Sequence, residues 1–92
     1  MFYCYILESH RNHRFYVGHA QDLDRRLHDH NRGHVTATRN KGPWKVVHYE
    51  GFATRAMASR REREIKGWKS AALIRELIAG SGLGRPDNRE GR

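Results

Sequence analysis

Short apolar runs near the start of the chain predict two β-strands joined by a polar turn. The segment FYCYIL over 2–7 is apolar, rich in aromatic residues and too short for a helix, and FYVG over 15–18 follows the polar stretch ESHRNHR. A connection of this length favours an antiparallel hairpin. The alternating segment WKVVHYEGF over 44–52 predicts a third strand.

Three helices are predicted from capping residues and apolar spacing. Asp22 is a suitable N-cap for a helix over 23–31, Thr54 for a helix over 55–69, and Ser70 for a short last helix. Residues at 3.6-residue spacing are expected to form the inward faces of the later two helices. These are Met57, Arg61, Ile65 and Trp68 in the second helix, and Leu73, Ile74, Leu77 and Ile78 in the third.

The element order ββαβαα predicts an α/β fold with a small, three-stranded, largely antiparallel sheet flanked by helices. A chain of 92 residues forms one domain, which we expect to cover 1–79. The polar and basic segment 32–43 is expected to be a surface loop. The last segment, GSGLGRPDNREGR over 80–92, is Gly- and Arg-rich and contains too few apolar residues to offset its ordering entropy, which predicts a disordered tail.

The charge of the chain points to a polyanionic partner. Lys and Arg number 18 against 10 Asp and Glu, which gives a net charge of +8, and nucleic acid is the partner that this surplus favours. Contacts with phosphates are expected from the basic loop and the second helix, through Arg39, Lys41, Lys45, Arg60, Arg61 and Lys66.

The location of the protein is predicted from its cysteine content and hydropathy. Cys4 is the single cysteine and lies in an apolar run, so we interpret it as a buried strand residue in a reducing compartment. The chain shows no leader pattern, and no apolar run approaches the roughly 18 residues of a spanning helix. We therefore expect a cytoplasmic protein without membrane contact.

Two charged or titratable residues lie on the inward side of the first predicted helix. With Leu23 placed at 0°, Leu27 lies at about 40°, His30 at about −20° and Arg26 at about −60°. A half-buried guanidinium requires an anion or an acceptor. Helix geometry alone favours a structural role for both residues: a salt bridge or a snorkelling side chain for Arg26, and a hydrogen-bonded core imidazole for His30.

The order of several motifs resembles the GIY-YIG endonuclease superfamily, in particular its small single-domain branch. The tripeptides Tyr3-Cys4-Tyr5 and Tyr16-Val17-Gly18 occupy the positions of the two name-giving tripeptides, although Tyr3 stands where the first has glycine. Arg26 matches the arginine of the family's first helix, and His30 the histidine or tyrosine one turn later. The stretch SRREREIKGWK over 59–69 resembles the glutamate-bearing helix. The resemblance extends over about residues 2–77.

This resemblance implies a divalent-metal-dependent endonuclease that uses Mg²⁺ or Mn²⁺. Periodicity does not distinguish Glu62 from Glu64, because they flank the apolar centre of the helix on opposite sides, but alignment on IKGWK selects Glu62 as the metal ligand and Glu64 as a solvated residue. A carboxylate suits Mg²⁺, which keeps most of its positions for water and phosphate. Arg26 is expected to bind non-bridging phosphate oxygens.

The resemblance favours Tyr5 as the base that contacts water, while His30 stays open as the alternative. A phenol with a pKa near 10 is only about 0.1% ionised at pH 7, so Tyr5 requires Arg26, the metal or His30 to lower its pKa. Tyr16 is expected to position the phosphate or to be a packed strand aromatic. Gly18 is expected to give the backbone room at the phosphate, and His19 to face the cleft.

Two functions are compatible with these features. The first is an endonuclease acting on DNA rather than RNA, directed by DNA structure in repair or recombination. The alternative is a basic nucleic-acid-binding module that keeps the nuclease fold with little or no catalysis. The sequence gives no indication of a protein partner and does not define the oligomeric state.

Overall fold

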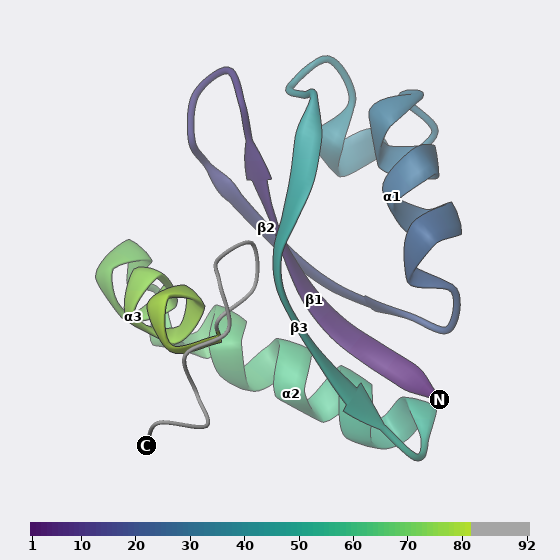
Figure 1. Ribbon diagram of the computed structural model, residues 1–92, viewed down its shortest axis with the longest axis vertical. Helices are drawn as coiled ribbons and strands as arrows, with labels where there is room; N and C mark the ends of the chain where they lie inside the picture. The colour runs from purple at the N-terminus through teal and green to yellow at the C-terminus, as the bar shows by residue number, and fades with distance from the viewer. Residues whose placement is uncertain (82–92) are drawn as a thin grey trace.

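The sheet has three antiparallel strands in the order β2-β1-β3 (Figure 1). The structure is a computed structural model that describes residues 1–81. Its strands are β1 (Phe2–Ser9), β2 (Phe15–Ala20) and β3 (Trp44–Phe52). In the hairpin, residues from Tyr3↔Ala20 to Glu8↔Phe15 are paired, and β1 pairs with β3 from Phe2↔Phe52 to Ser9↔Trp44. The predicted hairpin and third strand are confirmed, and within residues 1–81 no strand pairs with the outer edge of β2, which we call its free edge.

The helices are α1 (Leu23–Asn31), α2 (Arg55–Trp68) and α3 (Ala71–Ser81). Each begins at its predicted cap: the side-chain oxygens of Asp22, Thr54 and Ser70 accept backbone N–H groups at 3.0, 3.2 and 3.1 Å. The ββαβαα order is therefore confirmed. Helix α3 continues through Gly80 and Ser81, past the predicted boundary after residue 79. The remainder of the predicted tail, 82–92, lies outside the described residues.

The alternation of β1 side chains divides the core into two parts. Cys4 and Ile6 point to the face covered by α2 and α3, while Tyr5 and Leu7 point to the face covered by α1 (Figure 1). The predicted burial of Cys4 is confirmed, and this burial raises the pKa of its thiol to about 12. Because motif residues follow the same alternation, Tyr5 lies under α1 rather than under α2.

Two side chains predicted to face inward are exposed. Met57 is 46% exposed and Leu73 is 44% exposed. The inward face of α2 is centred on Ala58 and Ile65, both fully buried, and Met57 lies about 100° away from its neighbour Ala58 around the helix. In α3 the packed apolar side chains are Ile74, Leu77 and Ile78.

The prediction of a plain surface loop over 32–43 is wrong in one respect. The segment contains a short 3-10 helix, η1 (Thr36–Thr38), and Thr38 is 1% exposed. The indole N–H of Trp44 donates to the Thr38 carbonyl at 3.2 Å, which helps to hold this turn against the sheet. The loop therefore contributes a polar side chain to the interior.

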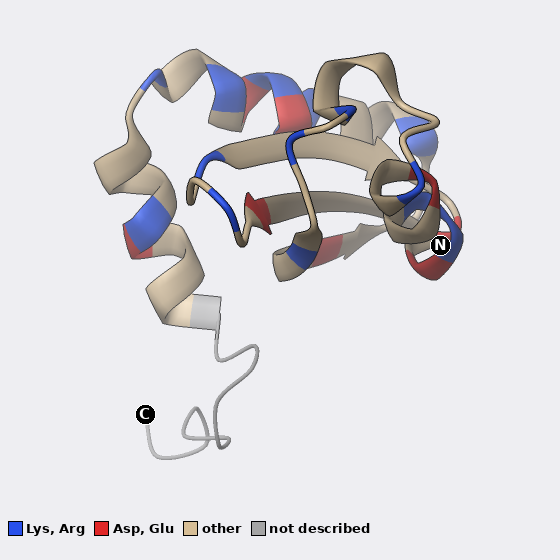
Figure 2. Cartoon of the chain, turned by 90° about the horizontal axis from the view of Figure 1, so that it is seen from above, with Lys and Arg blue, Asp and Glu red and all other residues tan. Residues whose placement is uncertain are grey.

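Basic residues are distributed over several parts of the chain. Figure 2 shows Lys and Arg on α2, on α3 and on connecting loops, with Asp and Glu among them on α2. In the described part of the chain, no helix is long and apolar enough to cross a membrane.

Candidate active site

A buried hydrogen-bonded pair, Tyr5 and His30, joins β1 to α1. The Tyr5 hydroxyl lies 2.9 Å from Nε2 of His30, and the two residues are 1% and 2% exposed. The other ring nitrogen, Nδ1, lies 2.7 Å from Oγ1 of Thr38, whose hydroxyl donates to the Val35 carbonyl at 3.4 Å. In this network Nδ1 carries the proton and donates to Thr38, so Nε2 accepts from the Tyr5 hydroxyl.

Both members of this pair are neutral at pH 7. Burial raises the pKa of Tyr5 to about 12, although Arg26 opposes the increase. Burial and the nearby charge of Arg26 lower the pKa of His30 to about 4. Arg26 lowers the pKa of Tyr5 as expected, but the cost of removing a phenolate from water outweighs this effect, so the net change is an increase.

Gly18 and Tyr16 of β2 pack closely on this pair. A Cβ atom at Gly18 would lie 2.7 Å from the Tyr5 hydroxyl oxygen and 3.0 Å from Cε2 of Tyr16. The Tyr16 ring lies edge-on to His30 with 4.8 Å between ring centroids. Glycine is therefore required at position 18 by the position of the Tyr5 hydroxyl rather than by a special backbone angle.

Arg26 is a half-buried cation without an ion-pair partner among residues 1–80. The Arg26 guanidinium lies beside the Tyr5 phenol, and a hydrogen bond between them raises the pKa of Arg26. Arg26 also lines a surface hollow of about 430 Å³, together with His19, Asp29 and Arg55. The salt-bridge alternative for Arg26 is thus absent from the described residues, and its charge remains open to an external anion.

Glu62 lies on α2, with its two carboxylate oxygens bonded to different cations. Oε1 is 2.6 Å from Nδ1 of His19, and Oε2 is 2.5 Å from Nζ of Lys66. Burial alone would raise the pKa of Glu62, but the hydrogen bonds from Lys66 and His19 outweigh it and lower the pKa. Glu62 is therefore ionised at pH 7. Glu64, by contrast, is 57% exposed and pairs with Arg61.

The predicted catalytic residues meet around the free edge of β2. Tyr5, Tyr16, Arg26 and His30 lie on the α1 side of the sheet, and Glu62 lies on the α2 side. His19 links the two sides, because it bonds to Glu62 and lines the same hollow as Arg26. Lys66 also links the two sides, because it pairs with Glu62 and its Nζ lies 5.9 Å from the Tyr16 ring centroid. We call these seven residues the candidate active site.

The seven residues of the candidate active site include one carboxylate, that of Glu62. Among the described residues, no three His, Cys, Asp or Glu side chains form a cluster that could hold a metal ion. The ionised, half-buried Glu62 fits the binding of Mg²⁺ through a single carboxylate, with water and substrate phosphate as the other ligands. Lys66 and His19 would have to share or release an oxygen of Glu62 for that ion to bind.

The other predicted nucleic-acid contacts are not gathered in the site. The side chains of Arg39 and Lys41 donate to the carbonyls of Gly33 and Ala37 within their own loop. Arg61 makes two hydrogen bonds with Glu50 at 3.0 and 3.1 Å, which ties it to β3. The two remaining predicted contacts, Lys45 and Arg60, are exposed and lie outside the candidate active site.

Thr38 is the site residue that the sequence did not reveal. It accepts from Nδ1 of His30 and so leaves Nε2 unprotonated to accept from the Tyr5 hydroxyl. Its segment, VTATRN, is polar and lacks periodicity, and no local pattern distinguishes a buried threonine from a solvated one.

Comparison with known proteins identifies the family of the chain. The family model of the GIY-YIG catalytic domain matches residues 1–75. A UPF0213 protein of Haloquadratum walsbyi is 40% identical over 85 residues, which cover 91% of this chain and 94% of that protein. A UPF0213 protein of Staphylococcus saprophyticus is 35% identical, with 85% and 95% of the two chains covered.

A solved structure gives the same result for the fold. The solution NMR structure of the UPF0213 protein BH0048 from Bacillus halodurans is similar to this chain with a TM-score of 0.54 and 30% identity. The similarity covers 94% of this chain and 100% of that chain, and thus includes all of its ββαβαα order. The chain therefore belongs to the GIY-YIG catalytic-domain family, among its small UPF0213 members.

Proposed function

We propose that this protein is a divalent-metal-dependent endonuclease that hydrolyses phosphodiester bonds in DNA. The observation that carries the proposal is the guanidinium of Arg26, which has no carboxylate partner in the described part of the chain. It lies beside the Tyr5–His30 pair and shares a hollow with His19, the partner of Glu62. A phosphate bound by Arg26 would lie among an anion-binding cation, a proton acceptor and an ionised carboxylate. This is the set of groups that phosphodiester hydrolysis requires.

In the proposed mechanism, Tyr5 and His30 remove the proton of the attacking water as a unit. The water transfers its proton to the Tyr5 oxygen while the Tyr5 hydroxyl proton passes to Nε2 of His30, so Tyr5 is never a free phenolate. His30 then becomes an imidazolium whose Nδ1–H still donates to Thr38. This route is compatible with the high pKa of Tyr5, about 12, because the final acceptor is the imidazole.

Substrate binding favours this proton transfer. Arg26 is one cause of the low pKa of His30, and a phosphate that neutralises Arg26 would raise this pKa towards its ordinary value. The base is thus strengthened when the substrate is in place. Tyr5 is 1% exposed, so the attacking water can reach its hydroxyl only if Arg26 and Tyr16 shift when the phosphate binds.

The remaining residues bind and orient the phosphate. Arg26 donates two N–H groups to non-bridging oxygens, and Tyr16 positions the phosphate from β2. Glu62 would hold Mg²⁺ or Mn²⁺, which when bound neutralises charge on the phosphate and the leaving oxygen. Lys66, displaced from Glu62, would remain beside Tyr16 as a second cation for the phosphate.

The finer assignments belong to the same proposal. We assign DNA rather than RNA as the substrate, with recognition of DNA structure in repair or recombination and action in the cytoplasm. The family and the net charge of +8 support a nucleic-acid substrate. The choice of DNA, the recognition of its structure and the cytoplasmic location are further parts of the proposal. Arg39, Lys41, Lys45 and Arg60 would contact phosphates outside the site, which gives binding with little sequence preference.

Cleavage of a substrate panel tests the proposal. Single-stranded, duplex, flapped and branched DNA, and an RNA of the same sequence, are incubated with the protein and Mg²⁺ or Mn²⁺, alongside Arg26→Ala and Glu62→Ala. We expect the wild type to cut at least one DNA and both variants to lose cleavage. Cutting that persists in both variants would assign it to a contaminant.

The same panel decides between this function and a binding module. If the wild type cuts no substrate in either metal but binds DNA, the chain is a basic nucleic-acid-binding module with the nuclease fold. The full set of Tyr5, Arg26, His30 and Glu62 favours the enzyme, since binding alone requires no buried Tyr–His pair.

A further inference from the structure

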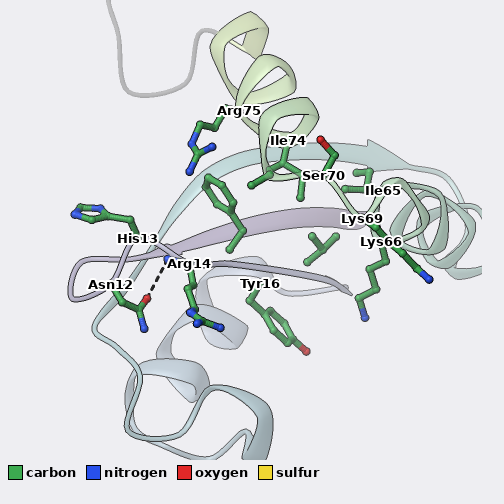
Figure 3. A pocket seen from close by; sticks show the side chains of 13 residues that line it. Asn12, His13, Arg14, Tyr16, Ile65, Lys66, Lys69, Ser70, Ile74 and Arg75 are labelled. Atoms are coloured by element: carbon green, nitrogen blue, oxygen red, sulfur yellow. Dashed lines mark hydrogen bonds between the residues drawn. The ribbon is translucent and has the colours of Figure 1, made fainter.

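A groove along the free edge of β2 lies next to the candidate active site, and apart from Tyr16 and Lys66 its lining residues have no role in the reaction described above. It encloses about 560 Å³ between the hairpin turn and β2 on one side and the region where α2 meets α3 on the other (Figure 3). Consecutive residues of β2, from Phe15 to Val17, line it. Since neighbouring side chains point to opposite faces of a sheet, the groove follows the strand edge rather than either face.

The groove is continuous with the candidate active site. Tyr16 and Lys66 line one end of it, and both belong to the site, through the Tyr16–His30 ring contact and the Lys66–Glu62 ion pair. In Figure 3 these two side chains lie at the same end, while Arg14 and Arg75 lie further along. A strand whose phosphate is bound at Arg26 would reach the groove by following β2 past Tyr16.

The charges of the groove are of one sign. Among its lining residues in the described part of the chain are Arg14, Lys66, Lys69 and Arg75, and none of these described residues is Asp or Glu. Arg14, Lys69 and Arg75 have no carboxylate partner among residues 1–80. Three cations without carboxylate partners around one groove favour an anionic ligand, because they give the groove a positive potential.

Lys69 supports this interpretation through its backbone. It follows α2 in the left-handed conformation, with φ 51° and ψ 40°, where glycine is usually found. A lysine at such a position costs stability. Its side chain lines the groove, and a function there explains why a lysine occupies this position.

The floor of the groove is apolar and includes an aromatic ring. Phe15 and Ile74 are partly buried against the core, and Val17 and Ile65 complete the surface beneath them. The Arg75 guanidinium lies over the Phe15 ring, 5.7 Å from its centroid. A duplex backbone needs only cations, but an apolar floor with a ring and a stacked guanidinium also suits the flat face of a base.

We propose that this groove binds an unpaired nucleotide of the substrate strand next to the phosphate that is cut. The base would pack on Phe15 and Arg75, and the phosphates would pair with Arg14 and Lys69. The inference rests on the proposed function for the identity of the ligand. It adds a binding site outside the catalytic residues and predicts that substrates with a single-stranded segment beside the cut are preferred.

Binding measured without metal tests the groove separately from catalysis. Fluorescence anisotropy gives the Kd of the full-length protein for a labelled 12-nucleotide DNA strand and for a blunt duplex of the same sequence, in EDTA and over a series of salt concentrations. The variants are Lys69→Gly, Arg75→Ala and Phe15→Leu. Arg63→Ala is the matched control, since Arg63 is an exposed arginine of α2 that does not line the groove.

Each variant has its own expected signature. Lys69→Gly and Arg75→Ala should weaken strand binding, and loss of the Lys69 phosphate contact should reduce the slope of log Kd against log salt by about 0.7. Lys69→Gly should also raise the urea midpoint of unfolding, because glycine suits the left-handed conformation, so weaker binding cannot be ascribed to misfolding. Phe15→Leu should weaken strand binding by about fivefold with little change in slope and leave duplex binding unchanged.

Several results would overturn the groove. An unchanged Kd for Lys69→Gly and Arg75→Ala, or an equal loss for Arg63→Ala, would refute it even if the protein cuts DNA. Equal effects of Phe15→Leu on strand and duplex would refute the contact with a base. Conversely, if the protein binds the strand through Lys69 and Phe15 but never cuts it, nucleotide binding in the groove is supported and the proposed nuclease activity is refuted.

Discussion

Replacing Gly18 with alanine tests whether the position of the Tyr5 hydroxyl matters for the reaction. The new Cβ would lie 2.7 Å from that oxygen and 2.9 Å from Cζ of Tyr5, whereas ordinary contact begins at 3.4 Å. The hydroxyl must therefore retreat by about 0.7 Å in a fully packed interior. A shift of this size away from His30 would stretch the 2.9 Å Tyr5–His30 bond to about 3.6 Å, beyond hydrogen-bond range.

The expected cost has two parts. Overpacking costs about 1–3 kcal/mol, and a lost buried hydrogen bond costs about 1–3 kcal/mol. We expect the free energy of unfolding to fall by about 2–6 kcal/mol. The rate of cleavage under single-turnover conditions should fall by about 100-fold, because the base is misplaced by a large fraction of an ångström.

Urea unfolding and a single-turnover cleavage assay measure these effects. Gly67→Ala is the matched control: no atom lies within 4 Å of a Cβ at this helical glycine, so alanine should stabilise the protein by about 0.5 kcal/mol and leave cleavage unchanged. Wild-type stability and activity in Gly18→Ala would refute the close packing on Tyr5. Lost stability with full activity would refute the role of the Tyr5 hydroxyl.

Three further predictions concern the neighbours of Tyr5. Thr38→Val leaves Nδ1–H of His30 without its acceptor, so it should lower the free energy of unfolding by about 1–3 kcal/mol and reduce cleavage. Thr38→Ser should keep the wild-type stability and cleavage rate. Urea unfolding and the cleavage assay measure these effects, and wild-type stability and cleavage in Thr38→Val would contradict the assigned tautomer. The pKa of His30 falls from 6.5 to about 4 on folding, so between these pH values the unfolded chain binds a proton that the folded chain does not. The free energy of unfolding should therefore decrease by about 3 kcal/mol as the pH falls from 6.5 to 4. His30→Gln should lack this decrease, and identical pH profiles of unfolding for the two proteins would refute the buried neutral imidazole. Arg26→Lys keeps the charge but loses the forked donor, so the cleavage rate should fall on the order of 100-fold. The free energy of unfolding should change by less than about 0.5 kcal/mol. Cleavage at the wild-type rate would show that the phosphate is bound elsewhere.

The fold could be predicted largely from local signals. Asp22, Thr54 and Ser70 each begin a helix by accepting a backbone N–H, and the apolar runs became the three strands. Helical angle placed His30 inward, where it is 2% exposed. Met57 and Leu73 show the limit of such reasoning, since both are apolar at plausible positions but lie outside the packed faces. Only the contacts between elements decide where a helix face is centred.

The candidate site depended more on resemblance and on tertiary structure. Periodicity left Glu62 and Glu64 equivalent, and only the structure shows that Glu62 reaches His19 across β2. The pKa of Tyr5 could not be predicted from its neighbours, because its burial decides the direction. Thr38 had no signal at all, since its partner, His30, lies eight residues earlier on another element.

The most direct test of the endonuclease proposal compares the wild type with Glu62→Gln. Glutamine keeps the shape of Glu62 and removes its charge, which is the feature expected to hold the metal. The measurement is the first-order rate of strand cleavage with excess protein and Mg²⁺, using identically purified samples on the DNA that the panel identifies. We predict cleavage by the wild type and a rate lower by at least about 100-fold in Glu62→Gln, with DNA binding in EDTA retained. Equal rates in the two proteins would contradict the assignment of this site as a metal-dependent nuclease centre.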